Sequence, residues 1–178
     1  EPFQAWNGKN YQSLKILLKS RGKCTTDHVS PAGPWLRFRG HLENISQNMY
    51  SGADNEFTNS IGEAINLEKG KTESIYDVAN FYKKNNIDWM VVADENYGEG
   101  SSREHAAMEP RFMGCKIILA KSFARIAQTN LKKQGIIPLI FKNKNDYDLI
   151  GSYDEVSTKN LEEFSAENNI VLIFKKPD

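Results

Sequence analysis

The sequence predicts an α/β fold whose sheet is partly parallel. Three short apolar runs, at residues 89–93, 116–120 and 136–141, have the length and composition of buried strands. Segments with apolar residues at helical spacing separate these runs. Such alternation is typical of parallel sheets, because each crossover helix returns the chain to the same edge of the sheet.

The N-terminal half is less regular. Residues 1–14 are linker-like, and the apolar run at residues 15–19, bounded by turns, predicts a strand. Residues 20–34 are rich in glycine, threonine, serine, proline and aspartate, so we expect a loop there. Residues 35–49 contain apolar side chains at mixed spacing, and residues 50–73 predict a long surface excursion around a short apolar turn at residues 61–67. We expect this half to add β-structure outside the parallel core.

Two helices are predicted around the first long buried strand. Residues 74–84 place apolar side chains at helical spacing, which predicts an amphipathic helix. A shorter helix is expected over residues 102–112. Pro110 would break or bend that helix, because proline lacks the backbone N–H of a regular turn.

The last predicted elements follow the second buried strand. Ser122 is a suitable N-cap for a helix over residues 123–134, and Gly135 is a suitable C-cap. Residues 146–150 predict a short helix. Residues 170–174 predict the final strand.

The composition favours one globular domain and excludes several function classes. The 178 residues are 39% hydrophobic, and Lys plus Arg equals Asp plus Glu at 23 each. A net charge of zero gives no pull toward nucleic acid or a membrane surface, so we predict neither partner. No apolar run approaches the roughly 18 residues of a membrane-spanning helix. Because the sequence starts at Glu1 and stops just after a predicted strand, we expect a fragment of a longer multidomain chain.

Cysteine usage indicates neither a disulfide framework nor a metal site. The two cysteines, Cys24 and Cys115, are far apart in sequence and form no C-x-x-C spacing. A reducing compartment is the simpler interpretation. We therefore predict that this chain holds no metal by itself.

The loop at residues 94–105 is the best candidate for chemistry. It follows a buried strand and leads into a predicted helix, where free N–H groups and the helix dipole favour negative charge. Ser101, Ser102 and Arg103 add two hydroxyls and a guanidinium, and arginine suits bidentate capture of a carboxylate or phosphate. The loop therefore predicts an anion site.

Known motifs do not explain this loop. It lacks the P-loop pattern, the nucleophile elbow and the dinucleotide fingerprint, whose third glycine is replaced by Arg103. A purely structural interpretation also stays open, in which Ser101 or Ser102 is only the N-cap of the following helix.

A second polar cluster lies in the N-terminal half. Asp27 and His28 are adjacent and are candidates for an acid–base pair. Arg37 and Arg39 alternate, so in an extended segment both would lie on one face. Local hydrogen bonding and a solvated surface are the structural alternatives.

Together these clusters resemble the C-terminal swivel domain of mitochondrial-type aconitase. The resemblance is carried by five runs in order: GKCTTDH (22–28), GPWLRFRGHL (33–42), GEGSSREHAA (98–107), SFARI (122–126) and NLKKQG (130–135). It covers nearly the whole chain. It implies a single three-layer swivelling β/β/α domain over residues 1–178, with a partly parallel sheet.

The resemblance also implies a function. The family interconverts citrate and isocitrate through cis-aconitate, by dehydration and rehydration. Ser101 matches the catalytic base and Asp27 an active-site acid, while Arg39, Ser102 and Arg103 match positions that bind substrate carboxylates. Arg37 has no such role in the family. The isolated chain is expected to be inactive, because most of the site would lie in the other domains.

Cofactor and compartment follow from the same resemblance. The family carries a [4Fe–4S] cluster on three cysteines of its earlier domains, so the expected cluster lies outside this chain and Cys24 does not ligate it. The expected partners are citrate, cis-aconitate, isocitrate and the remaining aconitase domains. The resemblance implies the mitochondrial matrix, with the cytoplasm as the alternative.

Related functions stay open at this point. The small subunit of isopropylmalate isomerase shares the swivel fold and a similar GSSREH loop, but the GKCTTDH and WLRFRGH runs are typical of aconitases. One domain does not distinguish aconitase from homoaconitase. Some cytosolic aconitases are also iron-regulatory RNA-binding proteins, which the zero net charge does not favour.

Overall fold

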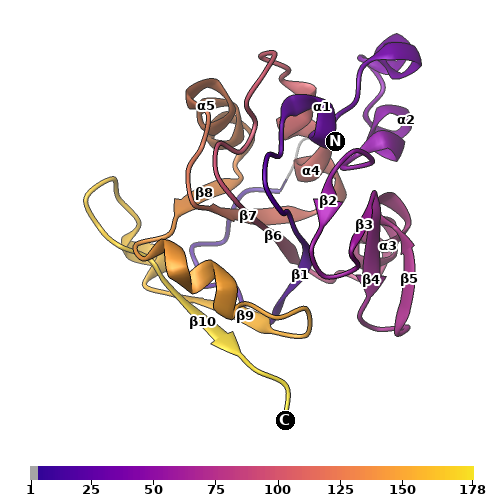
Figure 1. The fold of residues 1–178 in the computed structure, drawn as a ribbon. Coiled ribbons are helices and arrows are strands. Elements are labelled where there is room, and N and C mark those ends of the chain that lie inside the picture. The colour runs from indigo at the N-terminus through magenta and orange to yellow at the C-terminus, as the bar shows by residue number, and fades with distance from the viewer. Residues whose placement is uncertain (1–3) are drawn as a thin grey trace.

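A computed structural model describes residues 4–178 and contains one six-stranded mixed sheet at its centre (Figure 1). Four neighbouring strands are parallel, and the two C-terminal strands add antiparallel pairs at one edge. The predicted α/β class with a partly parallel sheet is confirmed. In spatial order the strands are β10 (Val171–Lys175), β9 (Glu155–Lys159), β1 (Leu14–Lys19), β6 (Trp89–Ala93), β7 (Cys115–Ala120) and β8 (Ile137–Ile140).

The central strands are buried because both faces of the sheet are covered. All five residues of β6 are buried, and Met90 of β6 pairs with Ile16 of β1 and Ile117 of β7. Continuous apolar runs of this kind are typical of parallel sheets between two layers. The sequence predicted β1, β6, β7, β8 and β10 to within one residue at either end.

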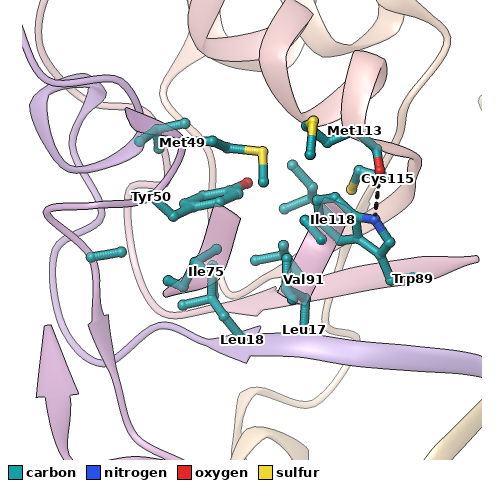
Figure 2. Packing of buried hydrophobic residues seen from close by; sticks show 14 of the residues in the cluster. Leu17, Leu18, Met49, Tyr50, Ile75, Trp89, Val91, Met113, Cys115 and Ile118 are labelled. Atoms are coloured by element: carbon teal, nitrogen blue, oxygen red, sulfur yellow. Dashed lines mark hydrogen bonds between the residues drawn. The ribbon is translucent and has the colours of Figure 1, made fainter. Parts of the chain in front are cut away.

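Helices cover one face of the sheet. Figure 2 shows Leu18 of β1, Val91 of β6 and Ile118 of β7 directed at the same apolar cluster. The indole Nε1 of Trp89 donates to the carbonyl of Met113, 3.0 Å away, which ties β6 to a covering helix. The covering helices are α3 (Ile75–Lys84), α4 (His105–Met113) and α5 (Arg125–Gln134).

The C-terminal part of the chain covers the other face. A second apolar cluster joins Met90 and Val92 of β6 to Tyr147 and Val156. Tyr147 belongs to η3 (Lys144–Leu149), the short helix expected at residues 146–150. Figure 1 shows this orange and yellow part on the side of the sheet opposite α4 and α5. The result is the expected three-layer arrangement.

The N-terminal half contains more structure than its sequence predicted. The loop expected at residues 20–34 includes α1, and residues 50–73 form two hairpins rather than a simple surface excursion. Tyr50 and Ala64 are fully buried there, because both side chains belong to the same apolar cluster as α3. The elements are α1 (Thr26–Val29), η1 (Gly33–Phe38), α2 (Leu42–Ile45), η2 (Ser46–Asn48), β2 (Asp54–Asn55), β3 (Ser60–Ile61), β4 (Glu63–Asn66) and β5 (Lys71–Ser74).

Helix ends confirm some predictions and correct others. Ser74 caps α3 by accepting from the N–H of Asp77, and Gly135 ends α5 with φ at 78°. The predicted cap at Ser122 is wrong, because the N-cap residue of α5 is Ala124. The Ser122 hydroxyl instead accepts from the N–H of Asn96, 2.8 Å away, and therefore holds the candidate loop.

The remaining segments are short. Of the linker-like residues 1–14, residues 1–3 lie outside the described part, residues 4–13 contain no helix or strand, and Leu14 begins β1. Two further elements, β9 and η4 (Leu161–Glu163), were not expected from the sequence. In the described part of the chain, no helix is long and apolar enough to span a membrane.

Candidate functional site

The candidate site is a cavity of about 570 Å³ beside the loop that joins β6 to α4. Its walls come from α1, residues 97–103, α4 and the start of α5. Alanine and other apolar side chains form much of the lining. Ser101, Ser102, Arg103, Arg125 and Asn130 add polar groups on the same cavity.

Backbone hydrogen bonds hold the loop between two other segments. The N–H of Gly98 donates to the carbonyl of Cys24 at 2.7 Å, and the N–H of Thr26 donates to the carbonyl of Glu99 at 2.9 Å. On the other side, the N–H of Tyr97 donates to the carbonyl of Ser122 at 3.0 Å. These bonds continue the order of β1, β6 and β7 beyond the ends of the strands. The loop is therefore fixed on the sheet.

Two positions of the loop require glycine for structural reasons. Gly98 has φ at 79°, and a Cβ there would lie 2.2 Å from the Cβ of Ala127 on α5. Gly100 has φ at 116°, and its Cβ would lie 2.9 Å from the Thr26 hydroxyl. Both positions combine a backbone conformation that disfavours side chains with close contact. The glycines thus let the loop pass between α1 and α5.

The helix after the loop begins later than predicted. The structure starts α4 at His105, with Glu104 as its N-cap residue, and continues it through Pro110 to Met113. Ser101 and Ser102 are therefore not the N-cap of this helix, which removes that structural alternative. Because Ser101 lies four residues before the first helical residue, the helix N-terminus supports an anion there less directly than expected.

Asp27 and Arg103 meet although they are 76 residues apart in sequence. A nitrogen of the Arg103 guanidinium, Nη1, forms an ion pair with Asp27 Oδ1 and also donates to the carbonyl of Ser30 at 3.1 Å. The Arg103 side chain is 15% exposed and that of Asp27 is 65% exposed. The guanidinium is thus held in place from α1, next to the two serines.

His28 does not join this pair. Its Nδ1 accepts from the N–H of Thr25 at 3.1 Å, within the cap of α1. Asp27 instead turns to Arg103, so the acid–base pair suggested by the sequence is not formed.

Arg39 lies apart from the cavity lining. It is an exposed residue at the end of η1. Burial lowers the pKa of His105, and the positive charges of Arg103 and Arg39 lower it further. Both guanidiniums are therefore close enough to influence the charge of the His105 ring. Arg103 is held by its contacts with Asp27 and Ser30, whereas Arg39 faces solvent.

The structure adds cavity residues that sequence reasoning missed. Thr26 is 4% exposed and lines the cavity, and its hydroxyl makes no hydrogen bond among the described residues. Arg125 and Asn130 line the opposite wall. The available signal was their position inside the SFARI and NLKKQG runs, which carried the resemblance without a role for either residue.

The chemistry of the cysteines does not suit metal ligation. Burial raises the pKa of Cys24 to about 12, and burial also raises the pKa of Cys115 well above its ordinary value. A metal ligand must be a thiolate, which these sites disfavour. Among residues 4–178, no group of three or more His, Cys, Asp or Glu side chains is placed to hold a metal ion.

Comparisons with known proteins agree on one family. The family described as "Aconitase C-terminal domain" matches residues 14–144. A mitochondrial aconitate hydratase of Gracilaria gracilis is 52% identical over 178 residues, which are 100% of this chain but 23% of that protein. A mitochondrial homocitrate dehydratase of Saccharomyces cerevisiae is 51% identical over 168 residues, 94% of this chain and 21% of that protein.

One solved structure supports the fold. The crystal structure of a 3-isopropylmalate dehydratase from Methanocaldococcus jannaschii matches with a TM-score of 0.56 at 23% identity. The match covers 95% of this chain and 84% of that one. At this identity the likeness concerns the fold alone.

Proposed function

The chain belongs to the aconitase C-terminal domain family, and from this membership we propose that it acts as the swivelling domain of an aconitate hydratase. It would contribute side chains to the isomerisation of citrate and isocitrate through cis-aconitate. The observation that carries the proposal is the meeting of two distant motifs, in which Asp27 of α1 holds Arg103 beside Ser101 and Ser102.

Ser101 is the proposed catalytic base. In the dehydration step its Oγ, as an alkoxide, would take the proton from the substrate carbon next to a carboxylate while the hydroxyl group leaves the neighbouring carbon, and it would return a proton in the rehydration step. A serine hydroxyl is a very weak acid, so the alkoxide needs nearby positive charge. The Arg103 guanidinium, which lines the same cavity and is mostly shielded from solvent, supplies that charge.

Arginines and Ser102 would bind the substrate carboxylates. A tricarboxylate brings three negative charges, and guanidinium groups bind carboxylates with paired hydrogen bonds. Arg103 would act from the cavity wall, oriented by the active-site acid Asp27. Arg39, which faces solvent, would act when the domain closes on the rest of the enzyme.

The residues of this chain do not fit as ligands of the [4Fe–4S] cluster that the family implies. Both cysteines are buried as thiols and lie apart from the cavity lining. We place the cluster, and most of the substrate site, in parts of a longer polypeptide. This agrees with the chain spanning about 23% of the relative from Gracilaria gracilis.

Aconitate hydratase is favoured over the related activities. The relative from Gracilaria gracilis carries that name and covers the chain completely, whereas the isopropylmalate enzyme shares only the fold. The homocitrate dehydratase at 51% identity keeps that activity as a second candidate. The mitochondrial names of these relatives favour mitochondria over the cytoplasm.

A chimera tests this proposal. The C-terminal domain of the Gracilaria gracilis aconitate hydratase is replaced by this chain, and the ultraviolet absorbance of cis-aconitate is followed with citrate and with isocitrate. We expect turnover in the chimera, none in the isolated 178-residue chain, and none with isopropylmalate. The unmodified Gracilaria enzyme is the matched control. A folded chimera with a full cluster and no turnover would contradict the proposal, as would turnover by the isolated chain.

A further inference from the structure

A buried carboxyl group lies next to the candidate site but is not part of the cavity lining. Glu109 is on α4, one turn after His105, and is 0% exposed. Its Oε1 accepts from the Ser30 hydroxyl at 2.8 Å, and its Oε2 makes no hydrogen bond within residues 4–178. A half-satisfied buried carboxyl group is unfavourable for stability, so packing alone does not explain it.

Ser30 connects this carboxyl group to the guanidinium of the site. The residue is fully buried at the C-terminal end of α1, where its N–H donates to the carbonyl of Thr26 at 2.8 Å. Its carbonyl accepts from Arg103 Nη1 at 3.1 Å, while its hydroxyl donates to Glu109. A short chain of contacts therefore runs from α4 through Ser30 to Arg103.

The main chain around Ser30 is held from other sides as well. The side-chain amide of Asn48 donates to the carbonyl of Pro31 at 2.9 Å, and the N–H of Tyr50 donates to the carbonyl of Val29 at 2.7 Å. These contacts fix the neighbours of Ser30 from η2 and the turn after it. Glu109 fixes Ser30 itself, from the helix that directly follows Arg103.

We propose that Glu109 is a positioning residue that orients Arg103 through Ser30. This inference rests on the proposed function, in which Arg103 binds a substrate carboxylate. Burial raises the pKa of Glu109 to about 8, so the group is mostly protonated at neutral pH. A neutral acid can accept the Ser30 hydrogen bond without competing with the substrate for the Arg103 charge.

Kinetics of the complete cluster-loaded enzyme test the proposal, using the variants Glu109→Ala, Glu109→Gln and Ser30→Ala. We expect Glu109→Ala to raise KM for citrate roughly tenfold, with a smaller change in kcat, because a charge-assisted contact to substrate becomes misaligned. Glu109→Gln keeps a neutral acceptor, so its KM should stay within about threefold of the unsubstituted enzyme. Glu163→Ala, on an exposed glutamate, is the control.

A double variant tests whether the effect passes through Ser30. If it does, Ser30→Ala combined with Glu109→Ala raises KM no more than Glu109→Ala alone. A merely structural role would lower the amount of active enzyme and leave KM unchanged. Unchanged KM in Glu109→Ala, equal damage in Glu109→Gln, or independent effects in the double variant would each overturn the proposal.

A readout without substrate separates this inference from the proposed function. The Nη1–H resonance of Arg103 in the complete enzyme reports its contacts by NMR, because Nη1 donates to Asp27 and to the Ser30 carbonyl. We expect Glu109→Ala to shift and broaden this resonance and Glu109→Gln to preserve it; an unchanged resonance in Glu109→Ala overturns the inference. Absence of citrate turnover in the unsubstituted enzyme would instead reject the proposed function. The Arg103 resonance would still show whether Glu109 orients Arg103.

Discussion

The buried carboxyl group of Glu109 makes the stability of this chain depend on pH. Its pKa is raised from 4.5 to about 8 in the folded state, mainly by burial, while the bond from Ser30 lowers it slightly. In the unfolded chain the group ionises near pH 4.5. As pH rises from 4.5 to 8, the unfolded state therefore loses a proton that the folded state keeps, and folding becomes less favourable.

The size of the effect follows from the two pKa values. Each pH unit between them lowers the free energy of unfolding by about 1.4 kcal/mol. The difference in that free energy between Glu109→Gln and the unsubstituted chain should therefore grow by about 3 kcal/mol from pH 5 to pH 8. The causes that lower the pKa of His105 are burial, Arg103 and Arg39 rather than Glu109, so this group largely cancels between the two proteins. Burial raises the pKa of Tyr97 well above its ordinary value, so Tyr97 stays protonated over this pH range.

Urea unfolding followed by tryptophan fluorescence measures this difference, because Trp89 is fully buried in the folded chain. The series should run from pH 5 to pH 9, with Glu163→Gln as a control that shows no pH-dependent difference. A Glu109→Gln difference that is the same at pH 5 and pH 8 would refute the reasoning, since Glu109 would then have an ordinary pKa.

Two further predictions use matched pairs of positions. Gly98→Ala should lower the free energy of unfolding by about 3 kcal/mol, because the new Cβ would contact Ala127 at 2.2 Å in a left-handed backbone. Gly70→Ala, at a positive φ but with open space around it, should lower it by only about 1 kcal/mol; equal losses in urea unfolding would contradict the assigned contact. Arg39→Gln in the complete enzyme should raise KM for citrate about tenfold. Arg37→Gln, whose guanidinium stacks 4.6 Å from the Phe38 ring, should change KM less than twofold, and the reverse order would reject Arg39 as a ligand for substrate.

The central fold was predictable because burial leaves a simple pattern in the sequence. The run at β6 is apolar throughout and that at β7 is apolar except for Lys116, so their strand character and parallel pairing could be inferred. In contrast, β9 has the sequence Glu-Val-Ser-Thr-Lys. Its buried residues Val156 and Thr158 alternate with the polar residues Glu155, Ser157 and Lys159. This strand is stabilised by its pairing with β1 and β10 and by the packing of Val156 in the second apolar cluster, and neither contact is visible in the local sequence.

The candidate site was predictable in part for a similar reason. Gly98, Gly100 and Arg103 lie in one loop, so a local pattern revealed them. The ion pair with Asp27, the buried position of Thr26 and the opposite wall at Arg125 depend on folding across tens of residues. Ser122 shows the opposite case, because a residue with a strong local preference for a helix cap is used to hold the loop instead.

The measurement that tests the central claim most directly is the kinetics of Ser101→Ala in the complete enzyme, with citrate binding measured separately. If Ser101 is the base, kcat should fall by at least about 100-fold while citrate affinity changes little. Ser152→Ala, at a serine outside the cavity lining, should leave both unchanged. A large loss of citrate affinity with unchanged turnover would contradict the assignment of Ser101 as the base.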